Sequence, residues 1–341
     1  MNDSVILDKI EYPLLILSSK AGYGNYSVGN ALFELTNKNG CVKHEEIEKL
    51  INTQLRDINF SRYYLLCTKA PWLLNLIYKI PLSYYFKYIK EQFFKNGDFS
   101  ILRDCINSFN YKTVICVNHR AAFWVSALKR RGEVDSRVLC VLSDYHMSPG
   151  WKYVFWNYID GLLGPALCSS ILSMVRGKYY QIDLPVQKDY DSLKNKPGDI
   201  KQVLITGGGW GIGPLFEAIS SLHNRFESLI LHVACGENKK LLEQINSYFG
   251  TSSRINVYPF VSSLMPIMAK CGSVVTRPSA ATITEAYRAR RMIFLLPGLP
   301  VIEENNAHYA MDNFSSKYFS IKAFEDWYEK NQNDFRVNIK L

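Results

Sequence analysis

The chain has 341 residues, of which 48% are hydrophobic, and it carries a formal net charge of +9. This length favours two domains of about 100–200 residues each, and the apolar content argues against a disordered protein. The positive charge favours anionic partners such as phosphates or acidic lipid surfaces, whereas no basic helix or known binding module points to nucleic acid.

The cysteines and the first residues of the chain indicate the cellular compartment of the protein. None of the eight cysteines forms a C-x-x-C pair, and most lie in apolar runs. This pattern predicts buried thiols in a reducing cytosol and no metal site. Acidic residues interrupt the first apolar stretch, and no run reaches the roughly 18–20 apolar residues of a membrane span. We therefore expect a cytoplasmic protein without a signal peptide.

The first half of the chain alternates short apolar runs with longer amphipathic runs. Residues 13–18, 113–117, 137–143 and 161–163 are too short and too apolar for exposed helices, and we predict strands there. A glycine-containing loop and a helix over residues 27–35 follow the first strand. Such alternation predicts a parallel sheet covered by helices on both faces.

A polar stretch then divides the chain. Residues 186–201 carry seven charged residues and little apolar content, and we predict an interdomain linker over residues 187–201. Strand-like runs return at residues 202–206, 228–234, 255–258, 273–276 and 292–296. We predict an N-terminal Rossmann-like domain over residues 1–186, a C-terminal one over residues 202–318 and a helical tail over residues 319–341.

A glycine-rich loop is the first candidate for ligand binding, because ligands bind beyond the carboxyl ends of strands in open parallel sheets. Residues 207–214 read Gly-Gly-Gly-Trp-Gly-Ile-Gly-Pro and follow a predicted strand. Glycines such as Gly208, Gly209 and Gly211 let the backbone approach a phosphate at the start of a helix. A tight strand–helix turn is the alternative, which five glycines in seven residues make less attractive.

Two further loops follow strands of the second half. Ser279 is an expected helix N-cap after Arg277, so the N–H groups up to Thr282 would face a ligand. Glu285, nearly two turns into that helix, is placed to bind a ribose diol or to remain a solvated helix residue. In the last loop, Glu303 and Glu304 open a helix after a Pro/Gly turn, and they either bind sugar hydroxyls or simply begin the helix.

The first half offers candidates at equivalent places. Gly24 and Asn25 follow the first strand, and Asp144 follows the strand at residues 137–143. A carboxylate there can act as a general base, although a turn-forming aspartate is the alternative. His146 and Trp151 are candidates to shape an acceptor pocket.

Taken together, these loops resemble those of the monogalactosyldiacylglycerol synthase and processive diacylglycerol glucosyltransferase family, relatives of the MurG glycosyltransferases. The resemblance runs from about residue 13 to residue 314 and rests on five segments in register. They are residues 14–32, the Ser-Asp-Tyr-His segment at 143–146 with Trp151, the glycine loop at 207–214, residues 276–286 and Glu303-Glu-Asn-Asn306.

The resemblance implies a GT-B fold, in which two Rossmann-like α/β domains with parallel sheets face a cleft. It implies a UDP-sugar donor held mainly by the C-terminal domain, with phosphates at the glycine loop and at residues 279–282. Glu285 would hold the ribose, and Phe260 and Val261 would border the base. Asp144 would be the catalytic base of an inverting transfer. Neither a metal nor a cofactor is expected, because helix dipoles and Arg277 would neutralise the leaving diphosphate.

Three positions depart from the family pattern. The catalytic candidate Asn25 stands where the family has a histidine in the first glycine loop, and an amide cannot take a proton, so any catalytic part of that histidine is lost or moved. Residues 278–282 carry side chains in place of family glycines, which would crowd a diphosphate. Ile302 replaces a glutamine and removes one partner for a sugar hydroxyl. These changes leave the expected scaffold intact but bear on the sugar, the acceptor and the activity.

An aromatic and lysine-rich segment at residues 63–90 suits a bilayer interface, although a packed helical subdomain has the same composition. With the resemblance, it favours peripheral contact with the anionic inner face of the cell membrane. We therefore expect a hexosyltransferase acting on a diacylglycerol-like or other amphiphilic acceptor. The alternatives are a transferase for a small soluble acceptor, a non-catalytic nucleotide-sugar-binding relative and, less favoured, a nucleotide-sugar epimerase.

Overall fold

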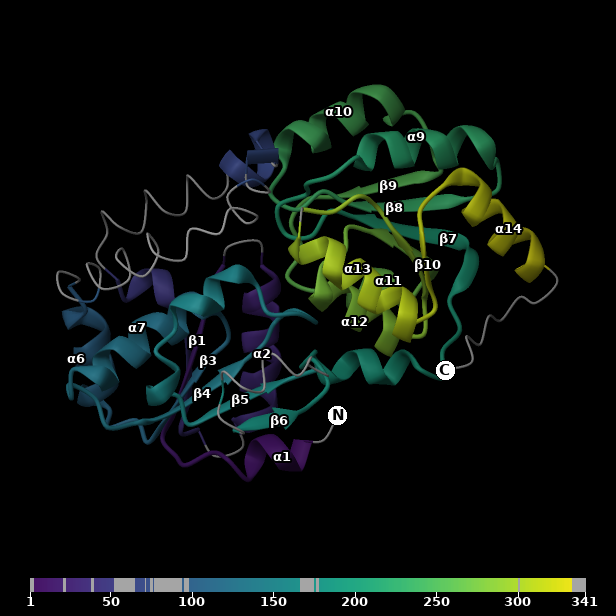
Figure 1. The fold of residues 1–341 in the computed structure, drawn as a ribbon. Helices are drawn as coiled ribbons and strands as arrows, with labels where there is room; N and C mark the ends of the chain where they lie inside the picture. Colours follow the sequence, from purple (N-terminus) through teal and green to yellow (C-terminus); the bar gives the residue numbers. More distant parts are fainter. Residues whose placement is uncertain are drawn as a thin grey trace. The chain divides into compact units, whose positions relative to one another are not determined.

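The computed structural model describes residues 3–20, 23–37, 40–51, 65–70, 72–73, 76, 94, 98–165, 175, 178–299 and 301–332. Apart from two short loop segments, the chain forms one compact unit up to residue 185 and a second from residue 186 onward. Each unit holds a six-stranded sheet with helices packed on it (Figure 1).

The sheet of the first unit is wholly parallel, as the alternating pattern predicts, in the order β2-β1-β3-β4-β5-β6. Its strands are β1 (Leu14–Ser18), β2 (Val42–Glu46), β3 (Thr113–Cys116), β4 (Arg137–Val141), β5 (Gly161–Gly164) and β6 (Tyr179–Gln181). The four inner strands are those predicted from apolar runs. Both edge strands were missed, because an edge strand needs no continuous apolar sequence.

Helices cover both faces of this sheet (Figure 1). Within the described residues they are α1 (Asp3–Leu7), α2 (Gly24–Thr36), α6 (Ser100–Ser108) and α7 (His119–Arg130), with 3-10 turns η1 (Ile47–Lys49), η2 (Pro149–Tyr153) and η3 (Trp156–Tyr158). Leu15 and Leu17 pack in one core with Leu102 of α6 and Val125 of α7. The Asn118 side chain accepts the Ala121 N–H at 2.8 Å and caps α7 directly after β3.

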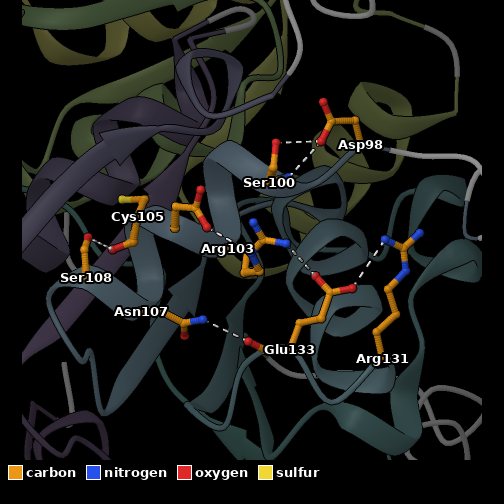
Figure 2. Close-up of polar contacts among 9 residues, drawn as sticks. Asp98, Ser100, Arg103, Cys105, Asn107, Ser108, Arg131 and Glu133 are labelled. Atoms are coloured by element: carbon orange, nitrogen blue, oxygen red, sulfur yellow. Dashed lines mark hydrogen bonds and ion pairs between the residues drawn. The ribbon is translucent and has the colours of Figure 1, made fainter.

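Polar contacts fix the outer helix α6 against the end of α7 (Figure 2). Asp98 accepts hydrogen bonds from the N–H and hydroxyl of Ser100 at the start of α6, at 3.0 and 2.7 Å. Arg103 reaches Glu133 at 3.7 Å, and Arg131 approaches the same carboxylate at 3.6 Å. These pairs are solvent-screened, so they orient α6 while the buried apolar residues supply most of the stability.

The sheet of the second unit is also wholly parallel, in the order β12-β11-β10-β7-β8-β9. Its strands are β7 (Asp199–Thr206), β8 (Ile230–Ala234), β9 (Ile255–Tyr258), β10 (Cys271–Thr276), β11 (Met292–Leu295) and β12 (Ser316–Tyr318). Its helices are α9 (Leu215–Arg225), α10 (Lys239–Phe249), α11 (Met265–Met268), α12 (Ala280–Arg288), α13 (Ile302–Asn313) and α14 (Ile321–Asn331).

Two segments are more ordered than their composition suggests. The stretch predicted as a linker contains the 3-10 turn η4 (Lys188–Leu193) and the first residues of β7. Within the predicted tail, α14 packs Phe324, Trp327 and Tyr328 into the core of the second unit. Both segments therefore contribute packing to the second unit.

Among the described helices, none combines the length and the hydropathy that crossing a membrane requires.

Candidate functional site

Three predicted donor loops meet at one edge of the second sheet. The glycine loop follows β7, Arg277 follows β10, and Gly298 to Glu303 follows β11. These three strands are immediate neighbours and run parallel, so their carboxyl ends lie side by side. This is the edge at which open α/β sheets bind ligands.

The glycine loop holds its shape through its own backbone and through the loop after β8. The Gly211 N–H donates to the Gly208 carbonyl at 3.0 Å, and Asn238 donates its side-chain amide to the Gly211 carbonyl at 2.9 Å. The Gly209 carbonyl accepts the Glu237 N–H at 2.8 Å. The loop is thus a fixed turn.

Two positions of this loop require glycine on different physical grounds. Gly211 has a φ of +59°, and a Cβ there would lie 1.8 Å from the Cys235 carbonyl oxygen, so its place is set by packing. Gly208 has a φ of +72°, but a Cβ there would meet only the Arg277 guanidinium, at 3.9 Å, among the described atoms. Gly208 therefore faces the arginine.

Arg277 is the buried cation of this edge, with 7% of its surface exposed. Its Nη1 lies 3.2 Å from the Glu303 carboxylate. Its Nε has no hydrogen-bond partner among the described residues although the atom is buried. A buried N–H without an acceptor is costly in a folded protein, and an anion at this edge would satisfy it.

The carboxylates of the last loop differ from each other. Glu303 is buried and accepts the Leu299 N–H in addition to pairing with Arg277. Its neighbour Glu304 is exposed on α13. Both residues were predicted from the sequence as binding candidates, but the ion pair between Glu303 and Arg277 was not.

Helix α12 begins as predicted, with Ser279 at the N-cap in an extended conformation, although the Ser279 side chain makes no capping hydrogen bond. Thr282 and Glu285 are both buried. The Glu285 carboxylate is in hydrogen-bonding contact with the phenol of Tyr190, from η4. A solvated Glu285, the alternative that the sequence left open, is wrong.

Phe260 and Val261 follow β9, which is separated from β7 by β8. Phe260 is 40% exposed. This pair thus lies at the same edge of the sheet, but two strands away from the glycine loop.

In the first unit, the structure connects two of the predicted loops. Asn25, at the start of α2 beside Gly24, accepts a hydrogen bond from the Ser143 hydroxyl, which immediately precedes Asp144. Asp144 and His146 are half-buried in the loop after β4. The β1 and β4 loops therefore lie together at the carboxyl edge of the first sheet.

Trp151 has a different environment from the one predicted. Only 4% of its surface is exposed, and it belongs to the core, where it stacks on Trp156 with ring centroids 5.9 Å apart. Its burial argues for a packing role, not for an acceptor contact.

A partly buried chain of polar side chains was missed in the sequence analysis. Ser18, at the end of β1, lies 2.6 Å from Nε2 of His44, and Nδ1 of His44 lies 2.9 Å from Asn30. Burial lowers the pKa of His44 from 6.5 to about 4, although the nearby Glu45 and Glu46 oppose the shift. The imidazole is thus neutral near pH 7. Because β2 has no continuous apolar run, the place of His44 beside β1 was not predictable from the sequence.

A polar cavity of about 740 Å³ lies at the opposite edge of the first sheet. Its lining includes Lys112, Asp160 and Lys178, which directly precede strands, and Arg137, the first residue of β4. The cavity is separate from the predicted loops, which follow strands. No cluster of three or more His, Cys, Asp or Glu side chains suited to a metal occurs within the described ranges, and the metal-independence of the chain stays a prediction.

No family model matches the chain. The chloroplastic monogalactosyldiacylglycerol synthase of Spinacia oleracea is 27% identical over 155 residues, which cover 40% of this chain and 28% of that protein. The processive diacylglycerol beta-glucosyltransferase of Staphylococcus aureus is 23% identical over 200 residues, covering 54% of this chain and 50% of that protein. The chain thus spans half or less of the length of these curated relatives.

Solved structures share the fold over nearly the whole chain. MurG of Acinetobacter baumannii matches with a TM-score of 0.55 at 13% identity, over 94% of this chain and 90% of its own. A putative UDP-N-acetylglucosamine 2-epimerase of Listeria monocytogenes matches with a TM-score of 0.55 at 11% identity, over 94% and 89%. The chain has the GT-B fold, and its resemblance to monogalactosyldiacylglycerol synthases and processive diacylglycerol glucosyltransferases is confirmed.

Proposed function

We propose that this chain is a glycosyltransferase that moves a hexose from a UDP-sugar to a diacylglycerol-like or other amphiphilic acceptor, with inversion at the anomeric carbon. The names of its relatives and its GT-B fold support the reaction class. The observation that carries the proposal is Arg277, a buried cation whose Nε lacks a partner beside a glycine-rich strand–helix turn.

On the donor side, the diphosphate lies against the glycine loop and the first turn of α12. The guanidinium of Arg277 stays charged at any physiological pH and can present its unpaired N–H to a phosphate oxygen. Glu303 pairs with Arg277 and accepts the Leu299 N–H, and we assign the contact with the sugar to the exposed Glu304. Glu285 binds the ribose, and Phe260 and Val261 border the base.

On the acceptor side, Asp144 takes the proton of the acceptor hydroxyl. As that oxygen bonds to the anomeric carbon, the bond from this carbon to the diphosphate oxygen breaks and UDP leaves with the electron pair. Asn25 cannot accept a proton and serves to hold the β4 loop through Ser143. Gly24 and His146 border the acceptor. Neither metal nor cofactor takes part in this proposal.

An amphiphilic acceptor requires access to a bilayer. Most of the segment at residues 63–90 lies outside the described residues, but Leu65, Trp72 and Leu76 within it are 58%, 68% and 49% exposed. Exposed large apolar side chains on a basic protein support peripheral contact with an anionic membrane surface from the cytoplasm.

The test combines calorimetry with UDP and an assay of UDP release from a panel of UDP-sugars with diacylglycerol vesicles. The pair Arg277→Gln and Glu303→Gln keeps a hydrogen-bonded couple without charge, and we expect it to lower UDP affinity at least about tenfold. The control Asp144→Asn should keep UDP affinity and lose transfer by about 100-fold or more. A wild-type protein that neither binds UDP nor releases it from any donor contradicts the proposal.

A second candidate is a nucleotide-sugar-binding protein without turnover, and the bond of Asn25 to Ser143 favours it. Asn25 stands where the family has a histidine, and its side chain already accepts the hydroxyl of Ser143. Binding of UDP by calorimetry together with the absence of transfer to lipid or soluble acceptors distinguishes this candidate.

A further inference from the structure

Tyr190 is the most deeply buried residue of η4, a turn inside the stretch whose composition predicts a linker. Only 1% of its surface is exposed, although four of the six residues of η4 are polar or charged by sequence and lie around it. A tyrosine buried to this extent requires partners for its hydroxyl group.

The partners of that hydroxyl lie on two elements of the second unit. The phenol contacts the Glu285 carboxylate on α12, and it also contacts the Ser263 hydroxyl and the Leu264 backbone just before α11. Burial, followed by the charge of Glu285, raises the pKa of Tyr190. The phenol therefore stays protonated, and its O–H donates a hydrogen bond to the carboxylate.

A second contact joins η4 to α12. Asp191, next to Tyr190, forms an ion pair with Arg288 at 3.3 Å. Arg288 lies three residues after Glu285, so both side chains are on one face of α12. The turn η4 is thus attached to α12 at successive helical turns, through Tyr190 to Glu285 and through Asp191 to Arg288.

The consequence concerns the orientation of Glu285. A buried carboxylate is costly unless hydrogen bonds support its charge, and it has enough acceptor sites to hold a phenol and a diol together. We propose that Tyr190 is a positioning residue that orients Glu285 toward the ribose diol of a bound nucleoside diphosphate. This inference rests on the proposed function, and it adds a residue from outside the predicted donor loops.

The test compares the affinity for UDP with that for 2′-deoxyuridine diphosphate. The wild-type protein should prefer UDP by about tenfold or more, because the ribose hydroxyl bonds to a charged group. Tyr190→Phe keeps the ring and removes the donor, so this preference should fall to within about twofold. Ser263→Ala keeps the phenol but removes one bond that places it, and the preference should fall by about threefold.

A matched control is Tyr328→Phe. Tyr328 is another buried tyrosine of the second unit, and its hydroxyl lies 2.9 Å from the hydroxyl of Ser228. This variant should keep the wild-type preference, whatever its effect on thermal stability.

The outcomes separate the two proposals. A wild-type preference that survives in both Tyr190→Phe and Ser263→Ala overturns the positioning role and leaves the proposed function standing. A wild-type protein that binds UDP without preferring it over the deoxy form overturns the ribose role of Glu285. If the wild-type protein does not bind UDP, both proposals fall together.

Discussion

His44 shows how a single half-buried side chain makes the stability of the fold depend on pH. Its ring nitrogens lie within hydrogen-bond distance of Ser18 and Asn30, and burial lowers its pKa from 6.5 to about 4. The unfolded chain therefore binds a proton at a pH where the folded chain does not. The contribution of the neutral imidazole is present above pH 6.5 and is lost as the pH falls toward about 4.

We predict that His44→Gln weakens the dependence of the stability on pH between pH 7 and pH 4. Urea unfolding of the wild-type protein between pH 7 and pH 4 should show a midpoint that falls more steeply than that of the variant, since the glutamine has no proton to gain. His308→Gln, at an exposed position of α13, is the control and should follow the wild-type curve. Parallel curves for wild type and His44→Gln would contradict the prediction.

Individual residues of the candidate site were predictable only as far as local sequence allows. Arg277 and Glu303 follow strands, and that position marks them as candidates. Their ion pair joins residues 26 positions apart, and only the parallel pairing of β10 with β11 brings them together. Tyr190 was missed because its neighbours are polar, a pattern that indicates a loop and conceals one buried ring.

At the scale of elements, the glycine loop yields a pair of contrasting variants. Gly211→Ala should destabilise the second unit by about 2 kcal/mol or more, because its Cβ would meet a backbone carbonyl that cannot easily move. Gly208→Ala should cost about 1–2 kcal/mol for its left-handed backbone but should reduce UDP affinity more strongly. Thermal unfolding and calorimetry measure the two effects, and equal losses of affinity in both folded variants would contradict the assignment.

Helix α14 gives a second prediction at this scale. A chain ending at Tyr318 lacks Phe324, Trp327 and Tyr328, and burying each such ring contributes about 2–3 kcal/mol. The sum is comparable to the whole stability of a typical domain, so the second unit should lose its cooperative unfolding transition. A chain ending at Gln332 keeps α14 whole and should unfold as the full chain does. Circular dichroism on heating distinguishes the two.

The predicted strands share one physical property. The inner strands of both sheets are buried on both faces, and their continuous apolar runs are visible in the sequence. The strands that were missed, β2, β6 and β12, are all at sheet edges, where short polar sequences can pair on one side only. Fold class was therefore predictable from the central strands alone, while the extent of each sheet was not.

At the scale of the whole molecule, charge and exposed apolar side chains act together. We predict that the protein floats with vesicles containing phosphatidylglycerol at low salt, and that the bound fraction falls as salt screens the charge. Replacing Leu65, Trp72 and Leu76 by serine should reduce the bound fraction severalfold, because each removes an insertable side chain. Phe109→Ser, at an exposed position outside that segment, should bind as the wild type does. Retention of full binding by the triple variant would contradict the prediction.

The edge strands also bear on how the protein behaves when concentrated. An open sheet edge is a template on which another chain can add a strand, and long apolar edges promote aggregation. Here β2 reads Val-Lys-His-Glu-Glu, and β12 has three residues with a lysine at its centre. Pairing of a second molecule with either of these two edges would desolvate charged side chains, so β2 and β12 disfavour strand addition at their own edges.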